Sequence, residues 1–230
     1  MEKKIYMSSM ACTKLKYYLY EHDFDITFLD GNGSPVYDEV STHADIHMCQ
    51  LGLWENAFIF PGNISKLQRH YPGNIIYNAV CTGKYFIHNM KYTDEDLLHC
   101  VRNWHDKNFT DSEHIFISVP QGYTRCCCLP VDDTSFITSD EGIFKILKSH
   151  DTDVLLINKG YVMLPGFDYG FIGGCAGHII ADGRRAIVFN GSLESHPDHK
   201  KITAFIKDRD IDIVSFKNEP LSDIGSILAC

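Results

Sequence analysis

Apolar residues along the chain switch between two kinds of spacing, and the switching recurs. One copy has an apolar run at 84–89, the stretch "YTDEDLLHCVRNW" at 92–104 and a second apolar run at 113–119. Side chains alternate along a strand but recur about every 3.6 residues along a helix. This copy therefore predicts a strand, a helix capped by Thr93, and a second strand.

The same order returns in three more places, one of them weaker. The strand, helix and strand ranges are 134–140, 141–150 and 153–158; then 185–191, 195–210 and 211–216; and, in the weaker copy, 56–61, 65–71 and 73–80. Ser139 is the expected cap of the helix at 141–150. A further short strand is predicted before each copy, in "HADIHMCQL", "NAVCT", "CCLPVDD" and "YGFIGGCAG". The repeated unit is therefore strand, strand, helix, strand.

The two ends of the chain supply the parts of a fifth unit. The N-terminus predicts a strand at 4–9, a helix at 12–23 and a strand at 24–30, and it lacks the first strand of the unit. The C-terminus carries a lone strand in "LSDIGSI", residues 221–227. Pairing of the chain ends would close the arrangement and leave no open sheet edge between the first and last units.

Length and charge narrow the class of protein. The 230 residues are 44% apolar, enough for a core in a single domain spanning 1–230. The net charge is −9 and the lysines form no basic stripe, so no nucleic-acid partner is expected. No run of about 18 apolar residues is present, which predicts no membrane contact and a cytoplasmic protein. The sequence leaves the oligomeric state open.

The nine cysteines have no metal-binding or redox spacing. They are odd in number, and three of them are adjacent, at Cys126, Cys127 and Cys128. We interpret them as free thiols in a reducing cytoplasm, with the adjacent three as small buried side chains.

The stretch "STHADIHMC" concentrates polar side chains. On a strand, His43, Asp45, His47 and Cys49 would all point to one side. Three explanations are open: a metal site, a catalytic His-x-Asp pair, and a half-buried strand whose polar groups are satisfied by neighbours. The metal site would use residues 43, 45 and 47, but it lacks a fourth ligand, so we expect no stoichiometric zinc.

Several phrases resemble a known fold family. The stretches "HADIHMCQLG", "GFIGGCAG", "HPDHKKITAFI" and "LSDIGSI" are similar to the pentein, or guanidino-group-modifying enzyme, superfamily, and within it to a small bacterial family of unassigned function. The resemblance covers the whole chain. It implies a five-bladed α/β propeller of pseudo-fivefold symmetry, closed by pairing of the N- and C-terminal strands.

The resemblance also implies a chemistry. In those enzymes a cysteine attacks a guanidinium carbon, a histidine in an H-x-D motif transfers protons, and carboxylates hold the cation. His43 and Asp45 match the H-x-D motif, and Cys81 in "NAVCT" is the expected nucleophile. Asp132 and Asp133 are the expected carboxylates, and the substrate-binding residues also include Asn78, Gly173 and Gly174. The implied ligand is a small guanidino or amidine cation, with no cofactor and no metal.

Two positions depart from the pattern. Ile172 stands where the family has a glutamate, and reading the units linearly makes Cys230 the alternative nucleophile. The resemblance therefore leaves a second function open, that of a non-catalytic binding protein like the ribosome anti-association factor of the same fold. A metal-dependent hydrolase is the third and least favoured interpretation.

Overall fold

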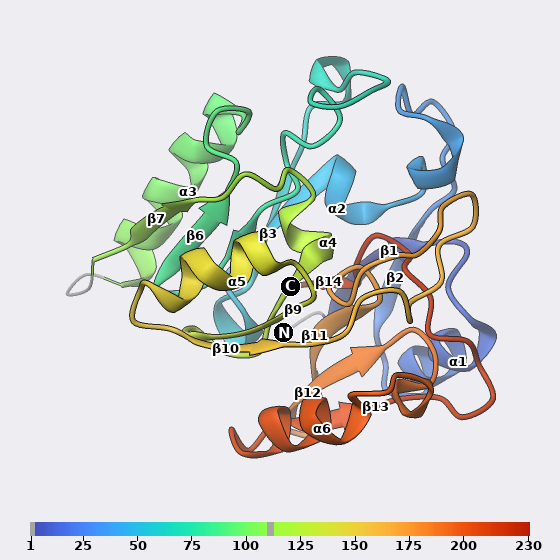
Figure 1. Ribbon diagram of the computed structural model, residues 1–230. Coiled ribbons are helices and arrows are strands. Elements are labelled where there is room, and N and C mark those ends of the chain that lie inside the picture. The colour runs from blue at the N-terminus through green and yellow to red at the C-terminus, as the bar shows by residue number, and fades with distance from the viewer. Residues whose placement is uncertain (1–2, 110–112) are drawn as a thin grey trace.

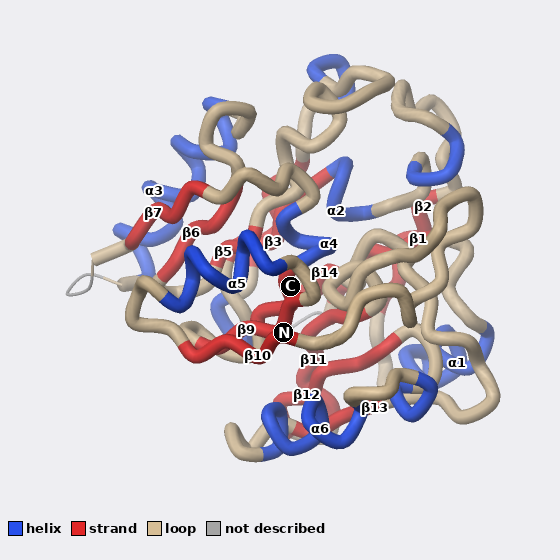
Figure 2. The backbone as a smooth tube through the Cα atoms, in the orientation of Figure 1, coloured by secondary structure: helices blue, strands red, loops and turns tan. Residues whose placement is uncertain are grey.

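A computed structural model describes residues 3–109 and 113–230, and within them the chain forms four small mixed β-sheets with helices between the strands (Figure 1). The strands are short, and long loops occupy much of the chain (Figure 2). The architecture is therefore α/β, as expected.

One sheet joins the two ends of the chain. Its elements are β1 (Lys4–Ser8), α1 (Thr13–Glu21), β2 (Asp25–Leu29) and β14 (Leu228–Ala229). The central strand β1 pairs in parallel with β2 and antiparallel with β14, and the register places Ile5 opposite Ala229. The predicted pairing of the chain ends is confirmed, although the pairing residues follow the expected segment 221–227.

The largest sheet has five strands in the order β4-β3-β5-β6-β7. Its elements are β3 (Met48–Leu51), β4 (Phe58–Pro61), β5 (Val80–Cys81), β6 (Tyr85–His88), α3 (Glu95–Asn108) and β7 (Ile115–Ser118). Strands β3 and β5 pair in parallel, where Leu51 lies opposite Cys81. This one contact joins two of the expected units in a single sheet.

The other two sheets have three strands each and one helix each. Their elements are β8 (Cys128–Pro130), β9 (Ser135–Thr138), α5 (Glu141–Lys148) and β10 (Asp153–Leu156), then β11 (Ala176–Ala181), β12 (Arg184–Phe189), α6 (His199–Lys207) and β13 (Asp212–Val214). In both, an antiparallel pair is followed by a parallel pair across the helix. These are the two units in which the predicted order of elements is clearest.

The predicted five-bladed propeller is wrong. The described residues contain four sheets instead of five, and none of these is closed or curled into a barrel or propeller. The physical reason is that a recurring order of elements reports local propensity, whereas the arrangement of units depends on long-range strand pairs such as β3 with β5.

Helices α3 and α5 each have their N-terminal cap one residue later than the sequence predicted. Asp94 caps α3 and Asp140 caps α5, each accepting a hydrogen bond from the backbone N–H three residues later. Thr93 and Ser139, the expected caps, immediately precede them. A carboxylate at this position also favours the positive end of the helix dipole.

The stretch at 43–49 is the main local error. Ala44–His47 form the single helical turn α2, and strand β3 starts only at Met48. A second short turn, α4 (Thr124–Cys127), likewise precedes β8. The expected helix at 65–71 is reduced to a 3-10 turn at Ile64–Lys66, because seven residues are too few for a helix that tertiary packing does not support.

Candidate functional site

The two short helical turns α2 and α4 lie near the centre of the molecule (Figure 1). Asn78 links them: its side-chain amide donates to the carbonyl of Asp45 (3.2 Å), and its oxygen accepts from the backbone N–H of Arg125 (2.8 Å) and Cys126 (3.3 Å). The backbone of Asp45 is also held from the C-terminal segment, by Gly225 O at 3.0 Å. These long-range hydrogen bonds hold residues 44–47 in a helical turn, where the local pattern predicted a strand.

Asp45 and Cys126 are in direct contact. The Cys126 thiol donates to Asp45 Oδ2 (3.0 Å), and Ser226 Oγ donates to the same oxygen (2.6 Å). Asp45 is 1% exposed, and its second oxygen, Oδ1, is buried without a hydrogen-bond partner among the described residues. Burial raises the pKa of this carboxyl.

His43 completes a three-residue cluster with Asp45 and Cys126. One side-chain donor atom from each lies within 4.8 Å of the other two. Burial lowers the pKa of His43 to about 4, although the Asp45 carboxylate opposes this shift, so the imidazole is neutral at pH 7. Gly225, with a φ of +71°, packs on this ring, and an added Cβ would lie 2.1 Å from the Cβ of His43.

A second buried carboxylate, Asp223, faces the same space. It accepts hydrogen bonds from the backbone N–H of Phe171 (2.9 Å) and Gly225 (3.0 Å). Burial raises its pKa to about 6 despite these bonds. An added Cβ on Gly174 would lie 2.0 Å from Asp223 Oδ1, so the glycine makes room for this side chain.

These groups open onto a cavity of about 300 Å³. His43, Cys126 and Asp223 contribute to its wall, and aromatic rings form much of the rest. The lining aromatic residues are Tyr37, Tyr123, Phe167, Tyr169 and Phe171. The hydroxyls of Tyr37 and Tyr123 are hydrogen-bonded to each other at 2.9 Å.

Arg125 places a positive charge behind the cavity. It is 5% exposed, and its guanidinium donates to the carbonyls of Gly173 (2.9 Å) and Ala176 (3.2 Å). Both of these hydrogen bonds are to backbone carbonyls, so the charge of Arg125 acts on Asp45 through space and partly balances it.

The thiol of Cys126 is protonated in this environment. Burial raises its pKa well above the usual value, and the carboxylates of Asp45 and Asp223 raise it further. A cation placed beside these carboxylates would cancel part of that effect, because it would stabilise the thiolate.

The structure brings together most of the residues predicted from the sequence. His43, Asp45 and Asn78 are in the site, and the backbone N–H groups of Gly173 (2.8 Å) and Gly174 (3.1 Å) both donate to Cys126 O.

Cys81, Asp132 and Asp133 lie elsewhere. Cys81 is buried in the apolar cluster around β3 and β5, and it does not line the cavity. Asp133 accepts from the backbone of Gly83 at 2.7 Å, and Asp132 forms an ion pair with Arg209 at 3.2 Å. Asp133 therefore gives a hydrogen-bond partner to a local backbone N–H group, and Asp132 balances the charge of Arg209.

Sequence reasoning missed Cys126, Asp223 and Arg125. In the sequence, Cys126 is one of three adjacent cysteines that are expected to be small buried side chains, and Asp223 lies in "LSDIGSI", whose pattern predicts a strand. Ile172, which stands where the guanidino-modifying enzymes have a glutamate, is 1% exposed and packs in the core. His47 also lies apart from the cluster, because its Nε2 donates to Ser41 O at 2.8 Å.

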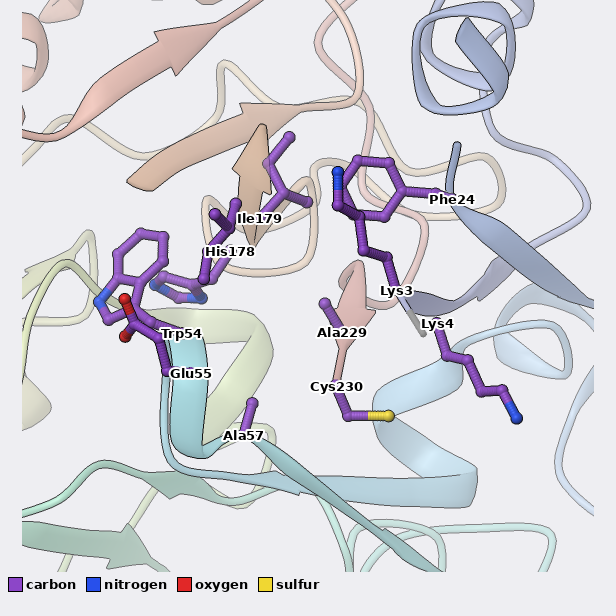
Figure 3. A pocket seen from close by; sticks show the side chains of 11 residues that line it. Lys3, Lys4, Phe24, Trp54, Glu55, Ala57, His178, Ile179, Ala229 and Cys230 are labelled. Carbon is purple, nitrogen blue, oxygen red and sulfur yellow. The ribbon is translucent and has the colours of Figure 1, made fainter. Parts of the chain in front are cut away.

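A second cavity, of about 290 Å³, lies where the chain ends pair (Figure 3). Lys3, Phe24, Trp54, His178 and Cys230 are among its lining residues. Its histidine and cysteine come from β11 and the C-terminus, and Figure 3 shows the Cys230 sulfur pointing away from His178.

Comparisons with known proteins give the family but no activity. None of the helices in the described part of the chain is long and apolar enough to cross a bilayer. No curated protein matches the chain. A family model matches residues 53–228, which include Cys126 and Asp223 but not His43 or Asp45. The match does not connect the chain with the guanidino-modifying enzymes, so that resemblance stays a prediction. Since the match covers more than half of the sequence, the chain belongs to a family of unknown function, DUF6873.

Proposed function

We propose that this protein is a cysteine-dependent hydrolase or transferase acting on a small amidine or guanidine cation, with Cys126 as the nucleophile. The observation that carries the proposal is that the Cys126 thiol, the His43 imidazole and the Asp223 carboxylate line one aromatic cavity, while the thiol is hydrogen-bonded to the Asp45 carboxylate behind it. The expected nucleophile Cys81 is replaced, because it lies in an apolar cluster away from this cavity.

The cavity wall suits a flat cation. Aromatic faces attract cations, and rings such as Tyr169 and Phe171 also stack on planar groups. Asp223 supplies the carboxylate that Ile172 cannot, and it would hold the N–H groups by charge-assisted hydrogen bonds. Such a contact is worth about 1.5–3 kcal/mol.

Asp45 is positioned to take the thiol proton. The S–H of Cys126 already points to Asp45 Oδ2, and the raised pKa of Asp45 makes it a stronger base than an exposed carboxylate. Attack forms the S–C bond and moves the C=N π electrons onto nitrogen, giving a neutral tetrahedral adduct as the proton passes to Asp45.

The adduct then loses an amine. Asp45 returns the proton to one nitrogen, and the C–N bond breaks with its electron pair leaving on that nitrogen. The remaining nitrogen forms a C=N bond, so a cationic thioester-like adduct stays on Cys126. Water then bonds to the carbon while the neutral His43 imidazole takes one of its protons and the C=N π electrons move onto nitrogen. The C–S bond breaks with its electron pair leaving on sulfur, which takes the proton from the imidazolium, and the oxygen forms the C=O bond as its remaining proton passes to solvent. A second amine in place of water would give the transferase reaction.

A binding role without chemistry is the second candidate. It is favoured by the protonated state of the resting thiol and by the core position of Ile172. Both candidates predict affinity for a cation, and they differ in whether Cys126 reacts with an amidine.

Brief treatment with a haloacetamidine and with the matching neutral haloacetamide separates these candidates. We expect the amidine to modify Cys126 at least about tenfold faster than the amide does, a difference of about 1.4 kcal/mol. Peptide mapping locates the modified cysteine. Cys126→Ser should abolish this labelling, and Cys127→Ser, which changes the adjacent buried thiol, is the matched control.

Equal rates with both reagents, or labelling that follows exposure and falls on Cys230, would contradict the proposed enzyme. Selective labelling of Cys126 by the amidine would contradict a role confined to binding.

A further inference from the structure

The three-residue cluster of His43, Asp45 and Cys126 has the composition of a transition-metal site. It offers an imidazole nitrogen, a carboxylate oxygen and a sulfur, all within 4.8 Å of one another. Zinc binds these three donor types at about 2.0–2.3 Å, and three protein ligands with one open position are typical of its non-structural sites. Magnesium and calcium prefer oxygen donors, so this set selects against them.

One ligand atom has no other partner. Asp45 Oδ1 is buried and accepts no hydrogen bond from the described residues, although buried carboxylate oxygens are normally satisfied. Neither ring nitrogen of His43 has a hydrogen bond to the described residues in the structure, whereas the ring of His47 is committed to Ser41. A bound ion would give a partner both to this oxygen and to the imidazole of His43.

Charge and outer contacts fit a divalent ion. With Cys126 as thiolate and Asp45 as carboxylate, two negative ligands balance a 2+ ion, and the thiol proton is released to solvent. Ser226 Oγ donates to Asp45 Oδ2 (2.6 Å) and Asn78 Nδ2 to Cys126 Sγ (3.4 Å), so both anionic ligands are supported from behind. The cavity beyond Cys126 gives an entry path and space for a water as fourth ligand.

We propose that a zinc-type divalent ion binds reversibly to His43, Asp45 and Cys126 and blocks the thiol of Cys126. The site differs from the set at 43, 45 and 47 that the sequence raised, because Cys126 replaces His47. Zinc binding does not depend on amidine chemistry, but any ligand that needs the sulfur competes with the ion. The metal would therefore act as an inhibitor or a protecting group.

Titration of the chelator-treated protein with zinc and with cobalt(II) tests the proposal. We expect one ion per chain and, with cobalt, a thiolate-to-metal charge-transfer band. Saturating zinc should slow alkylation of Cys126 by a neutral haloacetamide at least about tenfold. His43→Ala and Cys126→Ser should each weaken zinc binding by about a hundredfold or more, as expected for the loss of a ligand.

The chain offers matched controls. His47→Ala removes a histidine from the same helical turn, and Cys127→Ser removes the adjacent thiol; both should leave zinc affinity within about threefold of the parent. Circular dichroism checks that each variant is folded. Equal affinity in parent and Cys126→Ser protein, a cobalt spectrum without a thiolate band, or amidine hydrolysis that requires zinc would overturn the proposal. Amidine labelling of the metal-free protein is read separately, so failure of zinc binding does not count against the proposed enzyme.

Discussion

Two of the cavities in this protein are nearly equal in volume but differ in how their polar groups are hydrogen-bonded. The cavity at His43 and Cys126 measures about 300 Å³, and the one at the chain ends about 290 Å³. Each has a histidine and a cysteine in its wall. The presence of these two residue types alone would not distinguish them.

Hydrogen bonding separates the two cavities. His178, in the chain-end cavity, has its Nε2 bonded to Pro130 O at 2.7 Å, and its ring meets Trp54 edge-on at 4.8 Å. Since a carbonyl only accepts, Nε2 must carry the proton. In the other cavity the Cys126 thiol already points at the carboxylate of Asp45. The Cys126 thiol can pass its proton to this carboxylate, whereas the sulfur of the exposed Cys230 points away from His178 (Figure 3).

The contributions of Asp223 and His178, one from each cavity, to the pH dependence of stability should differ in sign. Burial raises the pKa of Asp223 to about 6 from 3.8, so the folded state binds this proton more tightly than the unfolded state does. Its contribution to stability is therefore largest below about pH 4 and is lost as the pH rises through 6. At about 1.36 kcal/mol per pKa unit, the loss is about 3 kcal/mol. Burial lowers the pKa of His178 to about 3 from 6.5, so its contribution is instead lost as the pH falls from 6.5 to 3.

Urea denaturation between pH 3.5 and 7.5 measures this contrast as differences from the parent. The free energy of unfolding of Asp223→Asn should increase relative to that of the parent as the pH rises. The free energy of unfolding of His178→Gln should increase relative to that of the parent as the pH falls. Parallel curves for parent and Asp223→Asn would show that the folded pKa of Asp223 is ordinary and would remove its distinction from an exposed carboxylate.

The preference for a cation should depend on Asp223 and not on the carboxylate in the wall of the chain-end cavity. Asp223→Asn should slow the reaction of Cys126 with a haloacetamidine by roughly tenfold to a hundredfold, because a charge-assisted contact of about 1.5–3 kcal/mol is lost. The rate with the neutral haloacetamide should change little. Glu55→Gln, a carboxylate in the wall of the chain-end cavity, is the control and should alter neither rate. An equal loss with both reagents would mean that Asp223 positions the backbone instead of binding the cation.

Backbone packing should be more demanding at the proposed site than at a surface turn. Gly174→Ala should lower the free energy of unfolding by roughly 1–3 kcal/mol, since the new Cβ would collide with Asp223 Oδ1. Gly183, at the turn between β11 and β12, has a φ of +74° and open space around it, so Gly183→Ala should cost only about 1 kcal/mol of backbone strain. Thermal denaturation of the two variants gives the comparison, and equal losses would show that the fit around Asp223 is loose.

The sequence by itself determined the order and type of most elements. Helices α1, α3, α5 and α6 and the strands beside them lie within a few residues of the predicted ranges. Alternating and helical spacing report which face of a segment is apolar, and capping depends on residues three positions apart, so both are local properties. Pairing of the chain ends also followed from the order of elements, because each end lacked what the other supplied.

Only the tertiary structure decided the helical turn at 44–47, the pairing of β3 with β5, and which cysteine lies in the proposed site. Residues 43–45 bend because Asp45 bonds to Asn78, Ser226 and Gly225, which are distant in sequence. Cys126 differs from the other eight cysteines because its sulfur reaches that carboxylate and it lines the same cavity as His43. Local patterns record which groups a segment prefers to bury, but reactivity depends on which groups from other segments are buried beside it, and that is settled by long-range packing.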